Sequence, residues 1–195
     1  MSDVQGKIQE LWKRILFTLF MLAVYRLATQ VPTPGVDTEA LKSLFDSNSQ
    51  SFFGILDKFN GGALQRFSVL ALGIMPYITS SIIFSLLAIS FPTIGEMQKE
   101  SEGHKKIQQW SRYLTILLCA IQGFMLSVGL ENSVSPNSGV SVVLEAGWSF
   151  RLMTMITLTA GTMFIMWMGE QITERGIGNG ISLIIFAGIA AGIPK

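Results

Sequence analysis

Long uncharged apolar stretches alternate with polar segments along this chain of 195 residues. No Asp, Glu, Lys or Arg occurs in residues 68–94, 113–130, 152–169 or 176–194. Uncharged apolar stretches of about 18 residues or more are typical of membrane-spanning helices, because a helix of that length crosses the hydrocarbon layer. The pattern therefore predicts an all-α, polytopic membrane protein.

Five membrane-spanning segments follow from this pattern. The predicted spans are residues 15–33, 113–130, 152–170 and 181–195, together with a kinked span that follows a short segment within residues 59–91. The predicted polar segments are 1–14, 34–58, 92–112, 131–151 and 171–180. The first span resembles a signal peptide, but no Ala-x-Ala cleavage site follows it, so we expect it to be retained. The fifth span is incomplete, and we expect the chain to be a fragment or one half of something larger.

Basic residues are distributed unequally between the two sets of polar segments. Eight Lys and Arg residues lie in 1–14, 92–112 and 171–180, whereas four lie in 35–66 and 131–151. Cytoplasmic loops carry the excess of positive charge, so we predict a cytoplasmic N-terminus and external segments at 34–58 and 131–151.

Arg26 lies inside the first predicted span, where a charge at mid-membrane costs about 2.5–3.5 kcal/mol on insertion scales. One interpretation is that its side chain reaches an interface or pairs with another helix. The other is that Arg26 belongs to a polar pathway through the membrane. Its position in the sequence leaves both open.

Composition agrees with a membrane protein and excludes several other functions. Hydrophobic residues make up 49% of the chain and charged residues only 14%, against about 25% charged residues in an average soluble domain. The net charge is +1, and no basic patch with interleaved aromatic residues indicates nucleic-acid binding. His104 and Cys119 are the sole residues of their types, so we expect no metal site and no internal disulfide.

Catalytic motifs are absent from the sequence: it contains no His-Glu-x-x-His, no Gly-x-Ser-x-Gly and no phosphate-binding loop. The glycine-rich residues 176–180 have the wrong spacing for a nucleotide loop and predict a turn. Glu170 and Glu174 are four residues apart, and we interpret them as a solvated helix end beside Arg175 rather than an acid–base pair. We therefore expect neither an enzyme nor a cofactor.

Residues 59–78 interrupt the regular pattern of the spans. Gly61 and Gly62 precede an apolar stretch that contains Gly73 and Pro76. Such residues are tolerated inside a span only where neighbours, side chains or water satisfy the backbone groups that they free. We predict a short helix after Gly62 and then a span kinked at a hinge formed by Gly73 and Pro76. A broken helix at membrane depth lines a cavity or a path, so this stretch indicates a conduit.

Two pairs of isoleucines share one spacing. Ile74 and Ile78 are four residues apart across Pro76, and Ile181 and Ile185 repeat that spacing after the glycine-rich turn. Residues four apart lie near one face of a helix, and stiff β-branched side chains from broken helices can form a narrow apolar constriction. The alternative is that they are ordinary isoleucines of membrane spans, and spacing alone does not decide between the two.

Several stretches of the chain resemble one known family: Val31–Gly35, Gly61–Leu64, Ala71–Ile78 and Gly161–Ser182. They resemble the bacterial SecY family, the channel subunit of the Sec protein translocon. The resemblance implies a ten-helix channel made of two pseudo-symmetric five-span halves, of which this chain is the N-terminal half. It also implies that the pore conducts unfolded polypeptides across the membrane and releases membrane segments laterally into lipid.

The resemblance also implies roles for particular residues. The pore ring of the family aligns with Ile74, Ile78, Ile181 and Ile185. The plug, a short helix that stops the pore from the outer side, aligns with Asn60, Gly61, Gly62, Ala63, Leu64, Gln65, Arg66 and Phe67. Candidate positions on the lateral gate are Thr79, Ser85 and Gln122.

The implied location is the bacterial cytoplasmic (inner) membrane. The implied partners are the subunits SecE and SecG, the motor ATPase SecA and the ribosome (both mainly through the other half), a translocating polypeptide and lipid. No nucleic acid is expected beyond ribosome docking. The alternative function is half of an inverted-repeat secondary transporter, which needs charged or polar ligands near the midplane that the later spans scarcely offer. An intramembrane hydrolase needs a nucleophile and a base that the sequence does not supply.

Overall fold

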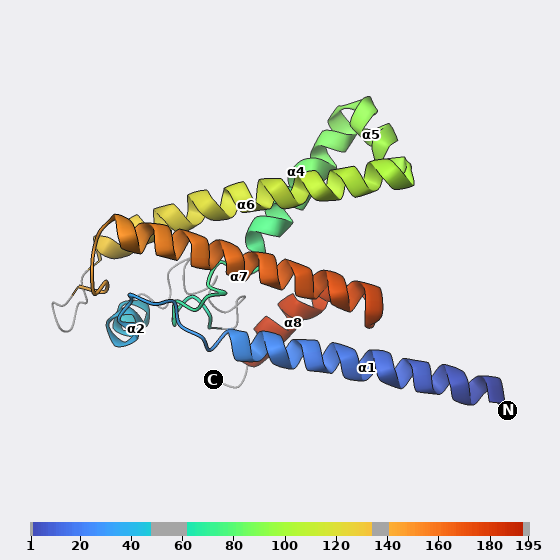
Figure 1. The fold of residues 1–195 in the computed structure, drawn as a ribbon, viewed down its shortest axis with the longest axis horizontal. Coiled ribbons are helices and arrows are strands. Elements are labelled where there is room, and N and C mark those ends of the chain that lie inside the picture. Colours follow the sequence, from blue (N-terminus) through green and yellow to red (C-terminus); the bar gives the residue numbers. More distant parts are fainter. Residues whose placement is uncertain (1, 48–61, 134–140, 193–195) are drawn as a thin grey trace.

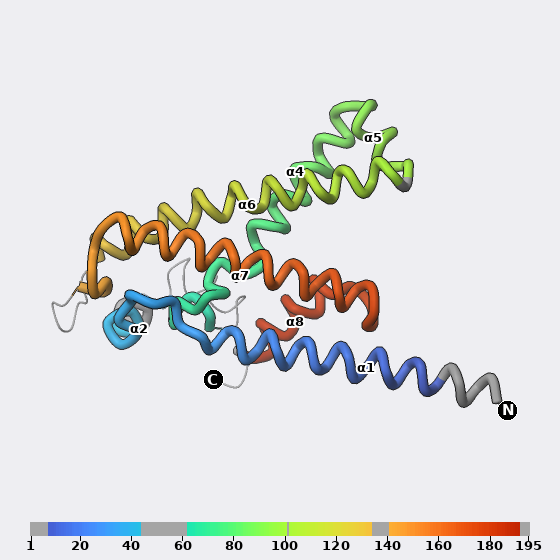
Figure 2. The backbone as a smooth tube through the Cα atoms, viewed as in Figure 1, coloured from blue at the N-terminus to red at the C-terminus, as the bar shows by residue number. Residues whose placement is uncertain are grey.

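The computed structural model describes residues 2–47, 62–133 and 141–192, and these residues are mostly helical (Figures 1 and 2). The helices are α1 (Ser2–Ala28), α2 (Thr38–Ser47), α4 (Met75–Ser90), α5 (Pro92–Lys99), α6 (Ser101–Glu131), α7 (Trp148–Arg175) and α8 (Gly180–Gly192). Within the described ranges the β-structure consists of two isolated antiparallel bridges, Pro32 with Ser68 and Val36 with Val143. The prediction of an all-α fold is confirmed.

Two of the described helices, α6 and α7, are long and apolar enough to cross a membrane. Helices α4 and α5 meet the same criteria together, but they are bent by 112° at their break. The break is Phe91, which is extended and precedes Pro92; proline disfavours helical backbone in the residue before it. Helix α8 is apolar but has 13 residues. The chain is thus a polytopic membrane protein, and the count of five spans stays a prediction.

Helices α6 and α7 pack antiparallel along most of their length (Figure 1). At one end Arg112 forms an ion pair with Glu170 at 2.8 Å, and at the other Arg151 pairs with Glu131 at 2.6 Å. Glu170 was expected to form a solvated end beside Arg175, and that expectation was wrong because the guanidinium of Arg112 on α6 lies within reach. Helix α4 joins this pair through buried Ser80, whose hydroxyl donates to the Ser111 carbonyl at 2.7 Å.

Helix α8 turns back against α7, and α1 lies on the same side of α7 and contacts both helices (Figure 2). A Cβ atom added at Gly180 would lie 2.0 Å from the Gly169 carbonyl oxygen, so the backbones of α7 and α8 touch there. The hydroxyl of Thr18 on α1 accepts a hydrogen bond from the Ile177 amide in the connecting turn at 3.2 Å. These contacts fix α1 and α8 to the same end of α7.

A cluster of buried hydrophobic residues joins segments that are distant in sequence. Its buried members include Leu41 on α2, Phe67, Val142 and Leu158 on α7. The Asp37 amide donates to the Val142 carbonyl at 2.9 Å, which ties the start of α2 to the segment before α7. This cluster holds the connections at the end of the bundle where α2 lies (Figure 1).

The pre-α4 segment (residues 62–74) differs from the prediction. It consists of consecutive turns and contains no helix, whereas a short helix was expected after Gly62. Helix α4 begins at Met75 with Pro76 in its first turn. Proline costs no helical hydrogen bond there, because the first amides of a helix have no partner within the helix. Gly73 (φ +58°) forms the turn immediately before it. The expected kink within a span is therefore the start of a helix.

Candidate functional site

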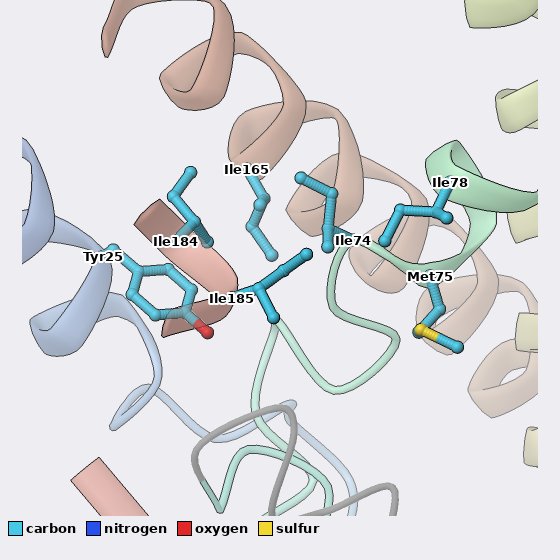
Figure 3. Close-up of a pocket in the computed structure, with 7 residues that line it drawn as sticks. All are labelled: Tyr25, Ile74, Met75, Ile78, Ile165, Ile184 and Ile185. Carbon is cyan, nitrogen blue, oxygen red and sulfur yellow. The ribbon is translucent and has the colours of Figure 1, made fainter. Parts of the chain in front are cut away.

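The isoleucine pocket is a small apolar cavity of about 40 Å³. Figure 3 shows the side chains that line it, which come from α1, α4, α7, α8 and the end of the pre-α4 segment: Tyr25, Ile74, Met75, Ile78, Ile165, Ile184 and Ile185. The volume is enough for a few water molecules, but the apolar walls offer a water molecule few hydrogen-bond partners. The tyrosine hydroxyl is the one side-chain polar group among these lining residues.

The start of α4 places two of the isoleucines. The Gly73 amide donates to the Leu70 carbonyl at 2.8 Å, and this turn brings the chain to Ile74. The carbonyl of Ile74 then accepts from the amides of Tyr77 and Ile78, both at 3.1 Å, which begins the helix. Ile74 is 5% exposed, so packing fixes its side chain at the residue directly before α4.

The turn into α8 places two more of the five lining isoleucines, Ile184 and Ile185. The Asn179 carboxamide oxygen accepts from the amides of Ile181 and Ser182, at 3.0 and 3.3 Å, as an N-cap residue does. The close approach of Gly180 to Gly169 then holds the first turn of α8 against α7. Ile184 and Ile185, one turn later, face the pocket (Figure 3).

The pre-α4 segment is attached to the chain that follows α1. The Thr33 amide donates to the Phe67 carbonyl at 2.8 Å, and the Val69 amide donates to the Val31 carbonyl at 3.0 Å. Phe67 is 1% exposed and has φ +43°, a left-handed value that is strained for a residue with a side chain. A Cβ atom added at Gly161 on α7 would lie 1.9 Å from the Val69 carbonyl oxygen, so the helix touches this segment at its backbone.

A sequence profile of the SecY family matches residues 68–195, which is more than half of the chain. The chain belongs to the SecY family.

Relatives and solved structures agree with this membership. The protein translocase subunit SecY of Helicobacter pylori (strain ATCC 700392 / 26695) is 49% identical over 183 residues, which cover 93% of this chain and 43% of that protein. The chain thus spans less than half the length of this SecY relative. The fold resembles Sec61 in the canine ribosome–channel complex from the endoplasmic reticulum, with a TM-score of 0.64 at 19% identity, covering 92% of this chain and 36% of that one.

The fold also resembles that of a SecY protein whose plug domain was studied for its role in the closed channel, with a TM-score of 0.60 at 20% identity. That likeness covers 92% of this chain and 36% of the other. Both structural likenesses support the channel-type fold of this chain.

Three of the four isoleucines expected for the SecY pore ring lie together. Ile74, Ile78 and Ile185 line the isoleucine pocket, whereas Ile181 lies outside it. A Cβ atom added at Gly169 would lie 3.2 Å from the Ile181 side chain, which places that side chain over α7. Ile184 lines the pocket in addition. Its place on the same face as Ile185 was not expected from the four-residue spacing.

Three further lining residues were missed from the sequence: Tyr25, Met75 and Ile165. Tyr25 is 4% exposed although it neighbours Arg26 within α1, and Ile165 is 1% exposed in the middle of α7. Neither has a local motif, since both reach the pocket through the packing of α1 and α7. Met75 directly follows Ile74, so its position beside a predicted residue could have found it.

The predicted plug residues are partly described. Asn60 and Gly61 lie outside the described residues. Ala63, Leu64 and Phe67 are buried, while Gly62 and Gln65 are half-buried. Exposed Arg66 donates a hydrogen bond to the side chain of Gln30. The described part of the predicted plug is therefore packed against its surroundings.

The predicted lateral-gate residues lie on two helices, Thr79 and Ser85 on α4 and Gln122 on α6. The hydroxyls of Thr79 and Ser85 are exposed and donate to carbonyls of their own helix, Met75 at 3.0 Å and Ser81 at 2.8 Å. Gln122 is half-buried on α6. Hydroxyls bonded in this way carry no signal of a polar pathway. Among the described residues no group of three or more His, Cys, Asp or Glu side chains suits a metal ion.

Proposed function

We propose that this chain forms one half of the wall of a protein-conducting channel, and that the isoleucine pocket is its part of the pore constriction. The convergence of Ile74, Ile78 and Ile185 on one cavity without a charged side chain supports this assignment. A translocated polypeptide presents every type of side chain, so a constriction with specific polar ligands would retain some of them. Apolar contacts fit around any sequence and limit the passage of ions.

Residues Asn60–Phe67 act as the plug in this proposal. The described residues of this stretch lead directly through the pre-α4 segment to Ile74, so they are continuous with the pocket wall. The SecY protein with the studied plug domain uses that domain to stabilise the closed channel. The bond between Thr33 and Phe67 sets the boundary of movement, because residues after Phe67 are tied to the chain that follows α1.

Gly73 and Pro76 serve as the hinge between the plug and α4, and Thr79, Ser85 and Gln122 lie on the chain's side of the lateral gate. Contact between α4 and α6 supports a gate panel made of both helices. The Ser80 hydroxyl lies 2.7 Å from the Ser111 carbonyl and 3.0 Å from the Ser111 hydroxyl. A panel joined in this way moves as one body when the gate opens.

The proposed location is the bacterial inner membrane, with the N-terminus in the cytoplasm as the distribution of Lys and Arg indicates. The proposed partners are SecE and SecG in the membrane, and SecA or the ribosome at the cytoplasmic side. No covalent chemistry is required of this chain, since those partners supply the driving force.

The secondary-transporter alternative is not favoured. A transporter binds its substrate near the midplane through polar groups at broken helices. The break before α4 here presents Ile74, Met75 and Ile78 to the cavity. These side chains offer no ligand for a charged substrate or a coupling ion.

Ion conductance of the full-length protein in planar bilayers tests the constriction. Replacing Ile78 or Ile185 by serine is expected to raise the resting conductance above that of the wild type, because a hydrated constriction passes ions. Ile181→Ser is expected to raise it too, since Ile181 packs against the buried cluster that contains Ile74. Ile189→Ser is the matched control, since Ile189 lies on α8, is 38% exposed and does not line the pocket. If the Ile78 and Ile185 variants seal as tightly as the wild type, or if Ile189→Ser leaks equally, the pocket is not the constriction.

A second experiment tests the plug. Deleting Asn60–Arg66 is expected to leave export working while it loosens the resting seal and relaxes the requirement for a functional signal sequence. Export and conductance are measured on the same preparation. Loss of folded protein on deletion would make this stretch a structural element rather than a plug.

A further inference from the structure

Two threonines from different helices bind backbone amides where the chain passes from α7 to α8. In the α7–α8 turn (residues 176–179), the Ile177 amide donates to the hydroxyl of Thr18 on α1 at 3.2 Å. The amide of Gly180, the first residue of α8, donates to the hydroxyl of Thr173 on α7 at 2.9 Å. The first amides of a helix have no partner within the helix. The two hydroxyls therefore bind groups that the backbone of α8 and its turn leave unpaired.

Each hydroxyl is oriented by a second hydrogen bond to its own helix. Thr18 donates to the Arg14 carbonyl at 2.8 Å, and Thr173 donates to the Gly169 carbonyl at 2.9 Å. A hydroxyl has one proton and two lone pairs, so each oxygen donates along its helix and accepts from the turn. Helices α1 and α7 thus each hold the start of α8 through one oriented bridge.

Glycines allow the chain to approach both bridges closely. A Cβ atom added at Gly176 would lie 2.5 Å from the Thr18 hydroxyl oxygen, and one added at Gly180 would lie 2.0 Å from the Gly169 carbonyl oxygen. Thr18 is 6% exposed and Gly180 is buried, so one partner in each bridge is shielded from water. Without the Thr173 hydroxyl the buried Gly180 amide would be unpaired, which costs more than the bond itself contributes.

The anchored end of α8 lies about one helical turn from the isoleucine pocket. Ile184 and Ile185 follow Gly180 by four and five residues, roughly 6–8 Å along the helix, and both line the pocket (Figure 3). Successive residues differ by about 100° around a helix axis, so a slip of α8 by one residue would turn Ile185 away from the cavity. Tyr25, two turns after Thr18 on α1, lines the same pocket. The position of α8 and that of the pocket wall therefore depend on the same neighbours.

We propose that Thr18 and Thr173 are positioning residues of the constriction, which set the rotation and height of α8 so that Ile184 and Ile185 face the pocket. This inference rests on the proposed function, since it concerns the same isoleucines. Through Thr18, helix α1 takes part in placing α8 although the two bonded residues are 159 positions apart in the sequence.

Amide hydrogen exchange of the full-length protein in lipid nanodiscs tests the two bridges. Thr18→Val and Thr173→Val keep the branched side chain and remove the hydroxyl. Exchange at Ile177 and at Gly180, respectively, is expected to become about fivefold faster, the factor for a bond of about 1 kcal/mol at about 1.4 kcal/mol per tenfold. Thr18→Ser and Thr173→Ser keep the hydroxyl and are expected to restore slow exchange. Unchanged exchange in both valine variants overturns the proposal.

Thr159→Val is the matched control for all measurements. Thr159 is half-buried on α7, and its hydroxyl donates to the Met155 carbonyl of the same helix at 2.7 Å. It removes the same group from the same kind of helix without touching α8. We expect this variant to leave exchange in the α7–α8 turn as in the wild type.

A distance measurement distinguishes positioning of α8 from local support of its turn. Spin labels replace Trp167 on α7 and Phe186 on α8, which are 49% and 66% exposed, while Cys119 is fully buried and takes up no label. The distance between the labels is expected to shift or broaden in the Thr173→Val and Thr18→Val variants and to return with serine. An unchanged distance overturns the positioning role.

Resting ion conductance then connects the position of α8 to the constriction. Both valine variants are expected to conduct more than the wild type, and both serine variants to seal. If Ile185→Ser leaks while the valine variants seal, Thr18 and Thr173 do not position the constriction. If Ile78→Ser and Ile185→Ser both seal, the proposed constriction itself is wrong. The label distance then decides alone: a changed distance supports positioning of α8 by the threonines, and an unchanged one overturns it.

Discussion

The α6–α7 pair and the pre-α4 segment are held by different parts of the chain. Side chains hold α6 to α7: an ion pair joins them at each end, and exposed apolar residues line the outer face between. The pre-α4 segment has buried side chains such as Phe67 and Leu70, and in addition its backbone is held by amide–carbonyl bonds to residues 31 and 33 and by contact with Gly161. Side-chain contacts tolerate replacement by similar groups, whereas backbone contacts leave no space for any added atom.

The largest expected effect comes from the contact between these two regions. Gly161→Leu is expected to prevent folding, because even the first added carbon would lie 1.9 Å from the Val69 carbonyl oxygen. Overpacking of a core commonly costs about 1–3 kcal/mol and sometimes more, and here a rigid backbone atom lies in the way. The yield of monodisperse full-length protein in detergent measures the loss.

Gly129→Leu is the matched control for that substitution. Gly129 is exposed on α6, and nothing lies within 4 Å of a Cβ atom added there. We expect this variant to fold as the wild type does. Equal yields from the two variants would show that α7 does not rest on the backbone of the pre-α4 segment.

Phe67→Ala is expected to destabilise the protein strongly, by about 3–5 kcal/mol, since truncating a buried phenylalanine leaves a cavity. Phe67→Gly is expected to be no worse than Phe67→Ala, because glycine adopts the left-handed backbone of this position without strain. The midpoint of thermal unfolding is measured for both variants. Phe164→Ala on α7 is the control, because the Phe164 side chain is 37% exposed. Similar losses at residues 67 and 164 would contradict the distinction between the two regions.

Ser80→Ala is expected to cost about 1 kcal/mol or less, the usual contribution of a hydrogen bond between helices in a membrane. It removes the bond to Ser111 that joins α4 to α6. Ser85→Ala is the control, since that hydroxyl bonds only within its own helix. Equal midpoints of unfolding for the two variants would mean that the bond does not contribute to holding α4 on α6.

The smallest expected effect is at the more exposed ion pair. The side chains of Arg112 and Glu170 are 42% and 26% exposed, and pairs of this kind contribute about 0.2–1 kcal/mol. Arg112→Glu and Glu170→Arg are each expected to lower the unfolding midpoint slightly, and the double exchange to restore it. A double variant less stable than both single variants would contradict a direct interaction.

The long helices could be predicted from the sequence because the residues that cross the membrane carry no charge. Absence of charge in 113–130 and 152–169 indicated two spans, and these residues lie inside α6 and α7. Both helices extend beyond these residues, since the hydrogen bonds of a helix can continue outside the membrane. The stretch 92–112 was expected to be a polar loop but is largely helical. Charge patterns locate the membrane better than they locate helix ends.

The irregular segment could not be predicted in the same way. Gly73 and Pro76 were expected to kink a span, whereas the helix begins at Met75 and the turns before it include Phe67, a bulky residue in a left-handed conformation. That conformation is stabilised by backbone bonding to residues more than thirty positions away, and local sequence does not record such pairing. In the pocket, likewise, spacing and resemblance found Ile74, Ile78 and Ile185. Tyr25 and Ile165 arrive there through tertiary packing alone.

The pairing of residues 31 and 33 with 67 and 69 also has a consequence for how this family can vary. The two attachment points hold together the two ends of residues 34–66. These ends stay in contact when the length between them changes. In general, closing a loop costs only about 0.6 kcal/mol more for each doubling of its length. Insertions in this interval outside α2 are therefore expected to leave Val69 in its place against Gly161.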